Sequence, residues 1–259
     1  MCLVILALGV HPGLPLVLAA NRDEFHRRPA ASAHAWHDLP GVVGGRDLEQ
    51  GGSWLAAARR GALAVVTNVR DPARRVTGGP SRGLLVRDFM APDGLTAEAF
   101  VRERTRPEAG YDGFNLIARD GSGTWYGSNR GPGRQLHNGI HALSNHLLDT
   151  DWPKVRRTRQ RFSAALHGPA DHLTDRLLDA LHDTTSAPDH ELPSTGVPLE
   201  WERRLAPPFI VSPEYGTRCS TVVTLDGCGT LTLTERSFDP AGQATGTVRL
   251  TLTDFGAPS

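Results

Sequence analysis

Residues 2–24, CLVILALGVHPGLPLVLAANRDE, contain two apolar runs separated by a short segment of turn-forming residues. The runs at 3–9 and 15–21 have the aliphatic and β-branched composition that is typical of strands. The intervening Val10–Leu14 segment contains Pro and Gly, which favour a turn. The stretch therefore predicts an antiparallel hairpin whose second strand ends in four consecutive polar residues.

The register of this hairpin places the polar tetrad beside the first cysteine. If the turn centres near residue 12, paired residues have numbers that sum to about 24 or 25. Cys2 then lies opposite Arg22 or Asp23. Because successive side chains of a strand alternate between the two faces of a sheet, Asn21 and Asp23 share one face while Arg22 and Glu24 share the other.

Cys2 has the chemistry of an N-terminal nucleophile. Removal of Met1 leaves one residue with a thiol and a free α-amine, whose reference pKa values are about 8.5 and about 7.7–8.0. Such an amine can accept the proton of its own nucleophile. Asp23 is then a partner for the ammonium, and Arg22 suits a thiolate or an anionic substrate. The structural alternatives are a small apolar residue that starts a strand and a solvated strand end.

The rest of the chain alternates between blocks of strands and blocks of helices, which favours an α+β fold with antiparallel sheets in a single domain spanning 1–259. Thr96 is the expected N-cap of a helix, and Asn138-Gly139 is a hairpin signal. The expected helices cover 81–91, 96–106, 153–167 and 171–183. Further strands are expected at 51–70 (a hairpin turning near 59–61), 114–118, 124–128, 218–225, 229–238 and 244–255.

Composition excludes several functional classes. The 28 basic and 28 acidic residues give no net attraction to nucleic acid or to an anionic membrane surface. Three cysteines, Cys2, Cys219 and Cys228, argue against a disulfide scaffold and for a reducing, cytoplasmic compartment, with the last two structural. No apolar run is long enough to cross a membrane. The eleven histidines lack the spacing of a zinc site.

Seven further segments, together with the first hairpin, resemble the NRDE-motif family of transport and Golgi organisation proteins. The resemblance extends from Cys2 to about Phe238. The segments are GGRD (44–47), GGSWLA (51–56), VTNVR (66–70), SRGLLV (81–86), GFNLI (113–117), LSNHLLDTDWPKV (143–155) and YGTRCSTVV (215–223).

The resemblance implies an N-terminal nucleophile hydrolase-like fold: a four-layer αββα sandwich of two antiparallel sheets between helix layers. A more distant similarity to the choloylglycine hydrolase and penicillin V acylase family implies roles for matching residues. Cys2 matches the nucleophile and Asp23 its acidic partner. Asn68 and Asn145 match oxyanion donors, and Arg218 matches a supporting arginine within different flanking residues.

The remaining members of the tetrad, Asn21, Arg22 and Glu24, are the expected substrate-binding residues. The expected activity is hydrolysis of an amide-like or thioester acyl substrate, with no cofactor required. The alternative is a non-catalytic carrier that uses the same cleft for haem or acyl-CoA. Neither the substrate nor the oligomeric state follows from the sequence.

Overall fold

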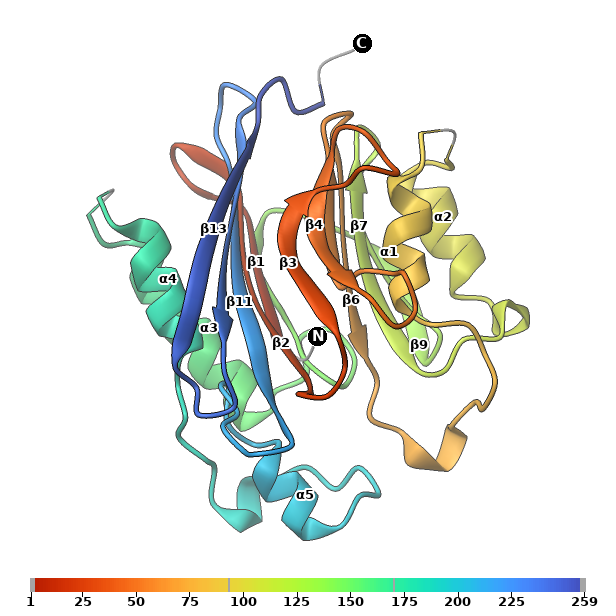
Figure 1. Cartoon of the computed structure of the whole chain (residues 1–259), viewed down its shortest axis with the longest axis vertical. Coiled ribbons are helices and arrows are strands. Elements are labelled where there is room, and N and C mark those ends of the chain that lie inside the picture. The colour runs from red at the N-terminus through yellow and green to blue at the C-terminus, as the bar shows by residue number, and fades with distance from the viewer. Residues whose placement is uncertain (1–2, 93, 170, 257–259) are drawn as a thin grey trace.

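The computed structural model describes residues 3–92, 94–169 and 171–256, and their strands form two antiparallel sheets that face each other (Figure 1). The first sheet has the strand order β10-β1-β2-β11-β12-β13, with β1 (Leu3–His11), β2 (Leu14–Phe25), β10 (Gly139–Leu143), β11 (Tyr215–Leu225), β12 (Leu231–Phe238) and β13 (Ala244–Leu252). The second has the order β3-β4-β5-β6-β7-β8-β9, with β3 (Ala30–Ala35), β4 (Val42–Asp47), β5 (Leu55–Ala58), β6 (Ala62–Asn68), β7 (Phe114–Asp120), β8 (Gly123–Ser128) and β9 (Gly131–Leu136).

Helices cover the outer face of each sheet (Figure 1). The helices α1 (Gly83–Met90) and α2 (Ala97–Arg104) pack on the second sheet, while α3 (Pro153–Leu166) and α4 (Leu173–Leu181) pack on the first. A short helix, α5 (Leu199–Arg204), lies beyond one end of the first sheet. The expected αββα sandwich is therefore confirmed.

Strand alternation explains why β1 reads as a continuous apolar run. Val4 and Leu6 belong to the core between the two sheets, whereas Leu3 and Ile5 belong to the core beneath α3 and α4. Both faces of β1 are thus covered in the first sheet, which is why apolar side chains occupy both faces of this strand. This double burial distinguishes the strand from the half-exposed strands of an open antiparallel sheet.

The predicted register of the first hairpin is confirmed over the described residues. Leu3 pairs with Asn21 and Leu8 pairs with Leu16, so the paired numbers sum to 24. The turn falls between His11 and Leu14, as the Pro-Gly pair indicates. Cys2 itself lies outside the described residues, and its expected position beside Arg22 or Asp23 stays a prediction.

Helix signals in the sequence are also confirmed. The Thr96 hydroxyl accepts a hydrogen bond from the Ala99 amide at 3.3 Å, which satisfies one of the unpaired amides in the first turn of α2. None of the helices within 3–92, 94–169 and 171–256 combines the length and the apolar character needed to cross a bilayer.

The hairpin predicted at Asn138-Gly139 is wrong. The strand before it, β9, pairs with β8 in the second sheet, whereas the strand after it, β10, pairs with β1 in the first. The segment is therefore a crossover between sheets. Asn138 packs against Gly9, where an added Cβ would lie 2.7 Å from the Asn138 side chain. This long-range contact outweighs the local preference of Asn-Gly for a tight turn.

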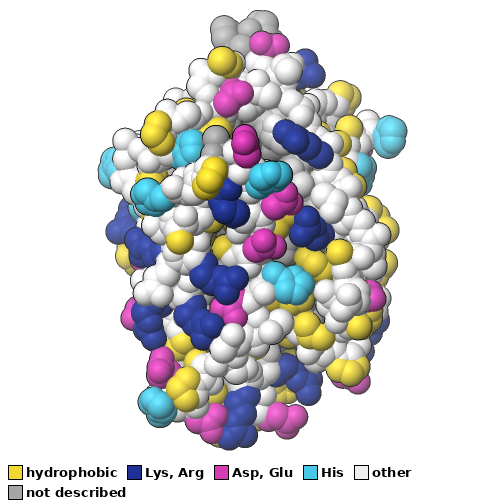
Figure 2. Space-filling view, turned by 90° about the vertical axis from the view of Figure 1, so that its left-hand side faces the viewer, with side chains coloured by type: hydrophobic (Ala, Val, Ile, Leu, Met, Phe, Trp, Pro, Cys, Tyr) yellow, Lys and Arg dark blue, Asp and Glu magenta, His cyan; other side chains and the backbone are white. Residues whose placement is uncertain are grey.

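Charged residues on the face of α3 and α4 are mixed in sign. Figure 2 shows basic, acidic and histidine side chains interspersed on this side of the molecule. Arg156 forms ion pairs with Asp151 and Glu191, and Arg157 pairs with Asp183. The arginine-rich segment of α3 is thus a solvated face with local acidic partners.

Candidate functional site

The polar end of β2 divides its side chains between the two faces of the first sheet, as alternation predicts. Arg22 and Glu24 point into the space between the sheets, where both line one pocket. Asn21 and Asp23 lie on the opposite face. All four residues remain within the strand rather than in a solvated loop, because β2 continues to Phe25.

Asn21 is held by hydrogen bonds on the face away from the pocket, and its predicted role in substrate binding stays a prediction. It is fully buried, and its amide donates to the carbonyls of Leu181 and Pro208 at 3.0 and 2.8 Å. Its side-chain oxygen accepts from the Ser220 hydroxyl at 2.6 Å. These bonds satisfy the amide and join β2 to the end of α4. The side chain of Asn21 therefore has hydrogen-bond partners for both its donor and its acceptor groups.

Asp23 is buried and hydrogen-bonded on the same face. Its Oδ1 accepts from the Thr217 hydroxyl at 2.7 Å, and that hydroxyl oxygen accepts from the Ile210 amide at 2.9 Å. The chain of bonds fixes the Asp23 carboxylate against β11. Its predicted pairing with the α-amine of Cys2 stays a prediction, because Cys2 lies outside the described residues.

Arg22 lies over an indole ring whose position depends on a glycine. The guanidinium carbon is 4.3 Å from the ring centroid of Trp54, and Arg22 is only 4% exposed. An added Cβ at Gly45 would lie 2.0 Å from the Trp54 ring, so no larger residue fits there without displacing the indole. The GGRD and GGSW motifs thus meet in space to place a flat surface beneath Arg22.

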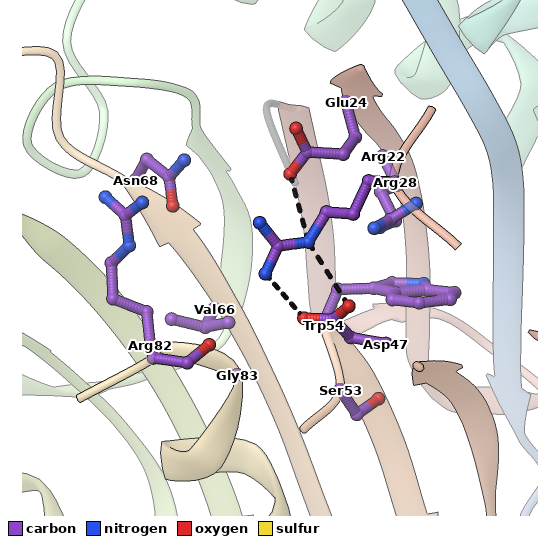
Figure 3. A pocket seen from close by; sticks show the side chains of 11 residues that line it. Arg22, Glu24, Arg28, Asp47, Ser53, Trp54, Val66, Asn68, Arg82 and Gly83 are labelled. Carbon is purple, nitrogen blue, oxygen red and sulfur yellow. Dashed lines mark hydrogen bonds and ion pairs between the residues drawn. The ribbon is translucent and has the colours of Figure 1, made fainter. Parts of the chain in front are cut away.

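Arg28 occupies the centre of the same region and holds the two carboxylates of the pocket (Figure 3), with Glu49 as a third acidic neighbour at 3.9 Å. It donates to Asp47 through Nε at 3.2 Å and Nη2 at 2.7 Å, and it lies 3.9 Å from Glu24. Such a two-bond contact with Asp47 fixes the plane of the guanidinium. Both acidic side chains in this region therefore have Arg28 as a basic partner.

Arg218 positions the turn that carries Arg28. Its Nη1 donates to the carbonyl oxygens of Phe25, His26 and Arg28 at 3.0–3.2 Å. Burial and the neighbouring Arg22 lower the pKa of Arg218 from its ordinary value. The contacts favour a positioning role for Arg218, while its predicted supporting role in catalysis stays untested.

The two asparagines predicted as oxyanion donors are neighbours. The side-chain amide of Asn145 donates to the backbone carbonyl of Asn68 at 3.2 Å. The backbone amide of Arg70 donates to the backbone carbonyl of Asn145 at 2.8 Å. A third bond runs from the Thr67 hydroxyl to the Ser144 carbonyl at 2.9 Å. The end of β6 in the second sheet is thereby joined to the end of β10 in the first.

One pocket brings Asn68 together with Arg22 and Glu24 between the sheets. Figure 3 shows Asn68 and Arg82 on one side of it and Arg28 with Trp54 on the other. Its volume is about 70 Å³, and a neighbouring cavity of about 470 Å³ shares Arg28, Ser81 and Arg82 with it. The smaller pocket is lined by Arg22, Glu24, Arg28, Asp47, Ser53, Trp54, Val66, Asn68, Ser81, Arg82 and Gly83.

Comparison with known proteins assigns the chain to a family. The family model described as Transport and Golgi organisation 2 matches residues 1–240. The chain belongs to the Transport and Golgi organisation 2 family. The homologue from Bos taurus is 35% identical, covering 92% of this chain and 93% of that protein, and the homologue from Homo sapiens is 32% identical with the same coverage. Transport and Golgi organization protein 2 of Drosophila melanogaster is 29% identical over 94% of this chain and 95% of its own length.

One solved structure is similar in shape. The Caenorhabditis elegans orthologue of N-acylethanolamine-hydrolyzing acid amidase has a TM-score of 0.49 at 11% sequence identity. The similarity covers 85% of this chain and 92% of the amidase chain.

Cys219 pairs with Arg22 across β11 and β2 of this family member, and both residues line a second pocket together with Glu235. Burial and the neighbouring Glu235 carboxyl hold the pKa of the Cys219 thiol well above its usual range, which disfavours a thiolate. Burial also raises the pKa of Glu235, whose oxygens accept from the Ala33 amide and the Thr221 hydroxyl. The interpretation of Cys219 as a structural residue agrees with this environment.

Several pocket residues were not among those predicted from the sequence: Arg28, Asp47, Trp54 and Arg82. The available signal was the pair of glycine-rich motifs, GGRD and GGSW, which the resemblance includes without assigning a role. A glycine pair beside an aromatic or charged residue indicates close packing of the backbone against a large side chain. Gly45 beneath Trp54 is such a case.

Proposed function

We propose that the chain is an N-terminal nucleophile hydrolase in which Cys2, after removal of Met1, attacks an amide-like or thioester acyl substrate. The observation that carries the proposal is the meeting of three polar strand ends around Leu3, the first described residue of β1. Leu3 pairs with Asn21 of β2, and the next residue, Val4, pairs with Leu143 of β10. Arg22 and Glu24 follow on β2, while Asn145 follows β10 and contacts Asn68.

The reaction uses groups of this chain and one water molecule. The Cys2 sulfur forms a bond to the acyl carbon while the α-amine takes the thiol proton. Collapse of the tetrahedral intermediate breaks the carbon–nitrogen or carbon–sulfur bond, and the proton passes to the leaving group. Water then cleaves the acyl-cysteine, which releases a carboxylic acid and restores the thiol. No oxidant, reductant or metal enters this balance.

Asn68 and Asn145 suit stabilisation of the oxyanion. Both stand at strand ends that hydrogen bonds join across the two sheets, and the Asn145 side chain is held by the Asn68 backbone carbonyl. Donors fixed before the reaction stabilise developing negative charge without reorganisation. The Asn145 amide keeps one N–H in addition to the one that it gives to the Asn68 carbonyl.

The competing proposal is a carrier that binds its ligand in the same pocket without turning it over. Arg22, Arg28 and Arg82 suit an anionic acyl ligand such as a thioester that bears phosphates. Haem fits the pocket less well. The described residues that line it include no His, Met or Cys to ligate iron. The enzyme and the carrier are separated by covalent chemistry at Cys2.

We expect the mature chain to begin at Cys2 and to form an acyl adduct there. Intact-mass measurement before and after treatment with an activated thioester should show loss of Met1 and then the mass of one acyl group, located on Cys2 by peptide mapping. The adduct should decay by hydrolysis. A native chain that retains Met1, or an acyl group that maps to Cys228 alone, would contradict the proposal.

Asn68→Ala should lower kcat by about 10²–10³ while changing KM little, because the oxyanion exists only in the transition state. Steady-state kinetics on the best substrate of an amide and thioester panel measure the effect. Thermal unfolding of the variant shows whether the junction with Asn145, which uses the Asn68 backbone carbonyl, is intact. A change confined to KM would assign Asn68 to ground-state binding.

A further inference from the structure

We propose that strand β13 pairs with β13 of a second copy of this chain, so that the first sheets of the two copies join into one continuous sheet. β13 is the last strand of the first sheet, and β12 is its hydrogen-bonded neighbour (Figure 1). Its other edge carries a row of backbone amides and carbonyls to which an added strand can bond. Pairing at this edge requires neither the hydrolase chemistry nor the pocket between the sheets.

The other three sheet edges carry features that block such pairing. At β10, the Asp149 carboxylate accepts from the Ala142 amide at 2.9 Å, and the Ala142 carbonyl accepts from the Asp149 amide at 2.7 Å. At β9, Pro132 has no amide hydrogen to donate. At β3, the Ala33 amide donates to the Glu235 carboxylate at 2.7 Å. Covering loops, prolines and inward-pointing charges protect edge strands against pairing with other chains.

Strand β13 has none of these features within the residues that the structure describes. Its sequence, ATGTVRLTL, contains no proline and a single charged residue, Arg249. Among the described residues, no hydrogen bond from outside β12 reaches its backbone. The ladder with β12 skips Thr245 and is regular over 246–252. This regular part of the strand is therefore the part that can extend the sheet.

The segment that follows β13 does not fold back over the free edge within the described residues. The Phe255 amide donates to the Gly229 carbonyl at 2.8 Å, and the Gly256 amide donates to the Arg59 carbonyl at 2.9 Å. These bonds lead the chain across to the second sheet, where Arg59 follows β5. The identical edge of a second copy suits the free edge of β13, because two-fold symmetry makes the two strands antiparallel.

Symmetry and charge select one register for this pairing. A two-fold axis perpendicular to the sheet places one residue opposite its own copy, and the other pairs follow from it. An axis at Val248, the middle residue of β13, pairs the largest number of residues. Thr247 then lies opposite Arg249 of the second copy, and Gly246 lies opposite Leu250. An axis at Arg249 would instead oppose two like charges, which is destabilising.

The inner face of the pair is complementary in shape in this register. A Cβ added to Gly246 would meet no atom within 4 Å, so there is open space beside this glycine. Leu250 is partly buried and packs against the core between the sheets. Each Leu250 therefore extends that apolar surface over Gly246 of the other copy. Because the shared edge is short, we expect an interface below about 1,200 Å², the size class of weak and transient complexes.

Sedimentation equilibrium of the full chain should show a reversible monomer–dimer equilibrium between about 1 µM and about 1 mM. Thr247→Lys should weaken the dimer about tenfold, because it places a lysine opposite Arg249 on both sides of the axis. Adding Arg249→Glu to this variant should restore the affinity, since each lysine then faces a glutamate. Thr247→Glu alone should tighten the dimer about threefold, a gain that a folding defect cannot produce.

Gln135→Lys is the matched control, because it adds the same charge at an exposed position of β9, the edge strand that contains Pro132. It should leave the dimer affinity unchanged. A chain that stays monomeric up to about 1 mM overturns the proposal. A dimer that Thr247→Lys does not weaken, or that Arg249→Glu does not restore, assigns the interface to another surface and also overturns it. Hydrogen exchange of the 246–250 amides should slow as the dimer forms.

Discussion

Cys2→Ala is expected to reduce turnover of an N-acyl amide or thioester panel by about three orders of magnitude or more, because removal of a nucleophile removes the covalent pathway. Ligand binding should persist, since the substitution deletes one sulfur atom and leaves the pocket lining of Arg22, Glu24 and Asn68 in place. The decisive comparison is between the effect of Cys2→Ala on kcat and its effect on ligand affinity. Single-turnover assays together with equilibrium binding of a non-hydrolysable amide provide it.

Cys228→Ala is the matched thiol control for this experiment. Cys228 is exposed in the turn between β11 and β12, and it should not affect turnover. Equal background hydrolysis by wild type and Cys2→Ala, combined with saturable binding by both, would replace the hydrolase by a carrier. Loss of both binding and turnover in Cys2→Ala would instead indicate a structural role for the cysteine.

Glu202→Ala should destabilise the fold by about 3–5 kcal/mol, because it leaves a buried cation without its partner. The Glu202 and Arg70 side chains are 3% and 10% exposed and form an ion pair. The other Glu202 oxygen accepts from the amide and hydroxyl of Thr195 at 2.9 and 2.6 Å. Since the Arg70 amide bonds to the Asn145 carbonyl, the loss should also disturb the junction of the two asparagines.

Chemical denaturation measures this effect, and Glu200→Ala is its control. Glu200 stands two residues away on α5, its side chain is 82% exposed, and it lies 3.6 Å from Arg204. Exposed pairs of this kind contribute about 0–1 kcal/mol. Replacing Arg70 and Glu202 together by Met and Leu should recover much of the lost stability. Similar losses for Glu200→Ala and Glu202→Ala would show that burial of the Arg70 pair is not what stabilises this region.

Local patterns determined the first hairpin and the faces of its polar end. The Pro-Gly turn fixed the register of the hairpin. Leu3 therefore pairs with Asn21, and their residue numbers sum to 24 as the position of the turn predicts. Alternation then placed Arg22 and Glu24 on the face opposite Asn21. These features depend on residues that are adjacent or paired across one turn, which is why the sequence alone determines them.

The tertiary structure decided what each polar side chain meets. Asn21 faces away from the pocket, and its side-chain amide donates to carbonyls 160 and 187 residues away in the sequence. Asn138-Gly139 has the composition of a hairpin but crosses between sheets, because β10 gains its partner in β1. In both cases a contact distant in the sequence overrides a local preference.

The sequence by itself therefore determined the strand blocks and the layer order that the family resemblance implies, while the nucleophile and oxyanion-donor roles that it suggests stay predictions. Only the tertiary structure brought Gly45 and Trp54 beneath Arg22 and joined Asn68 to Asn145. Periodicity reports which face of an element is buried, but not which element of the other sheet covers it. That partner is set by the packing of two sheets against each other, to which residues from the whole chain contribute.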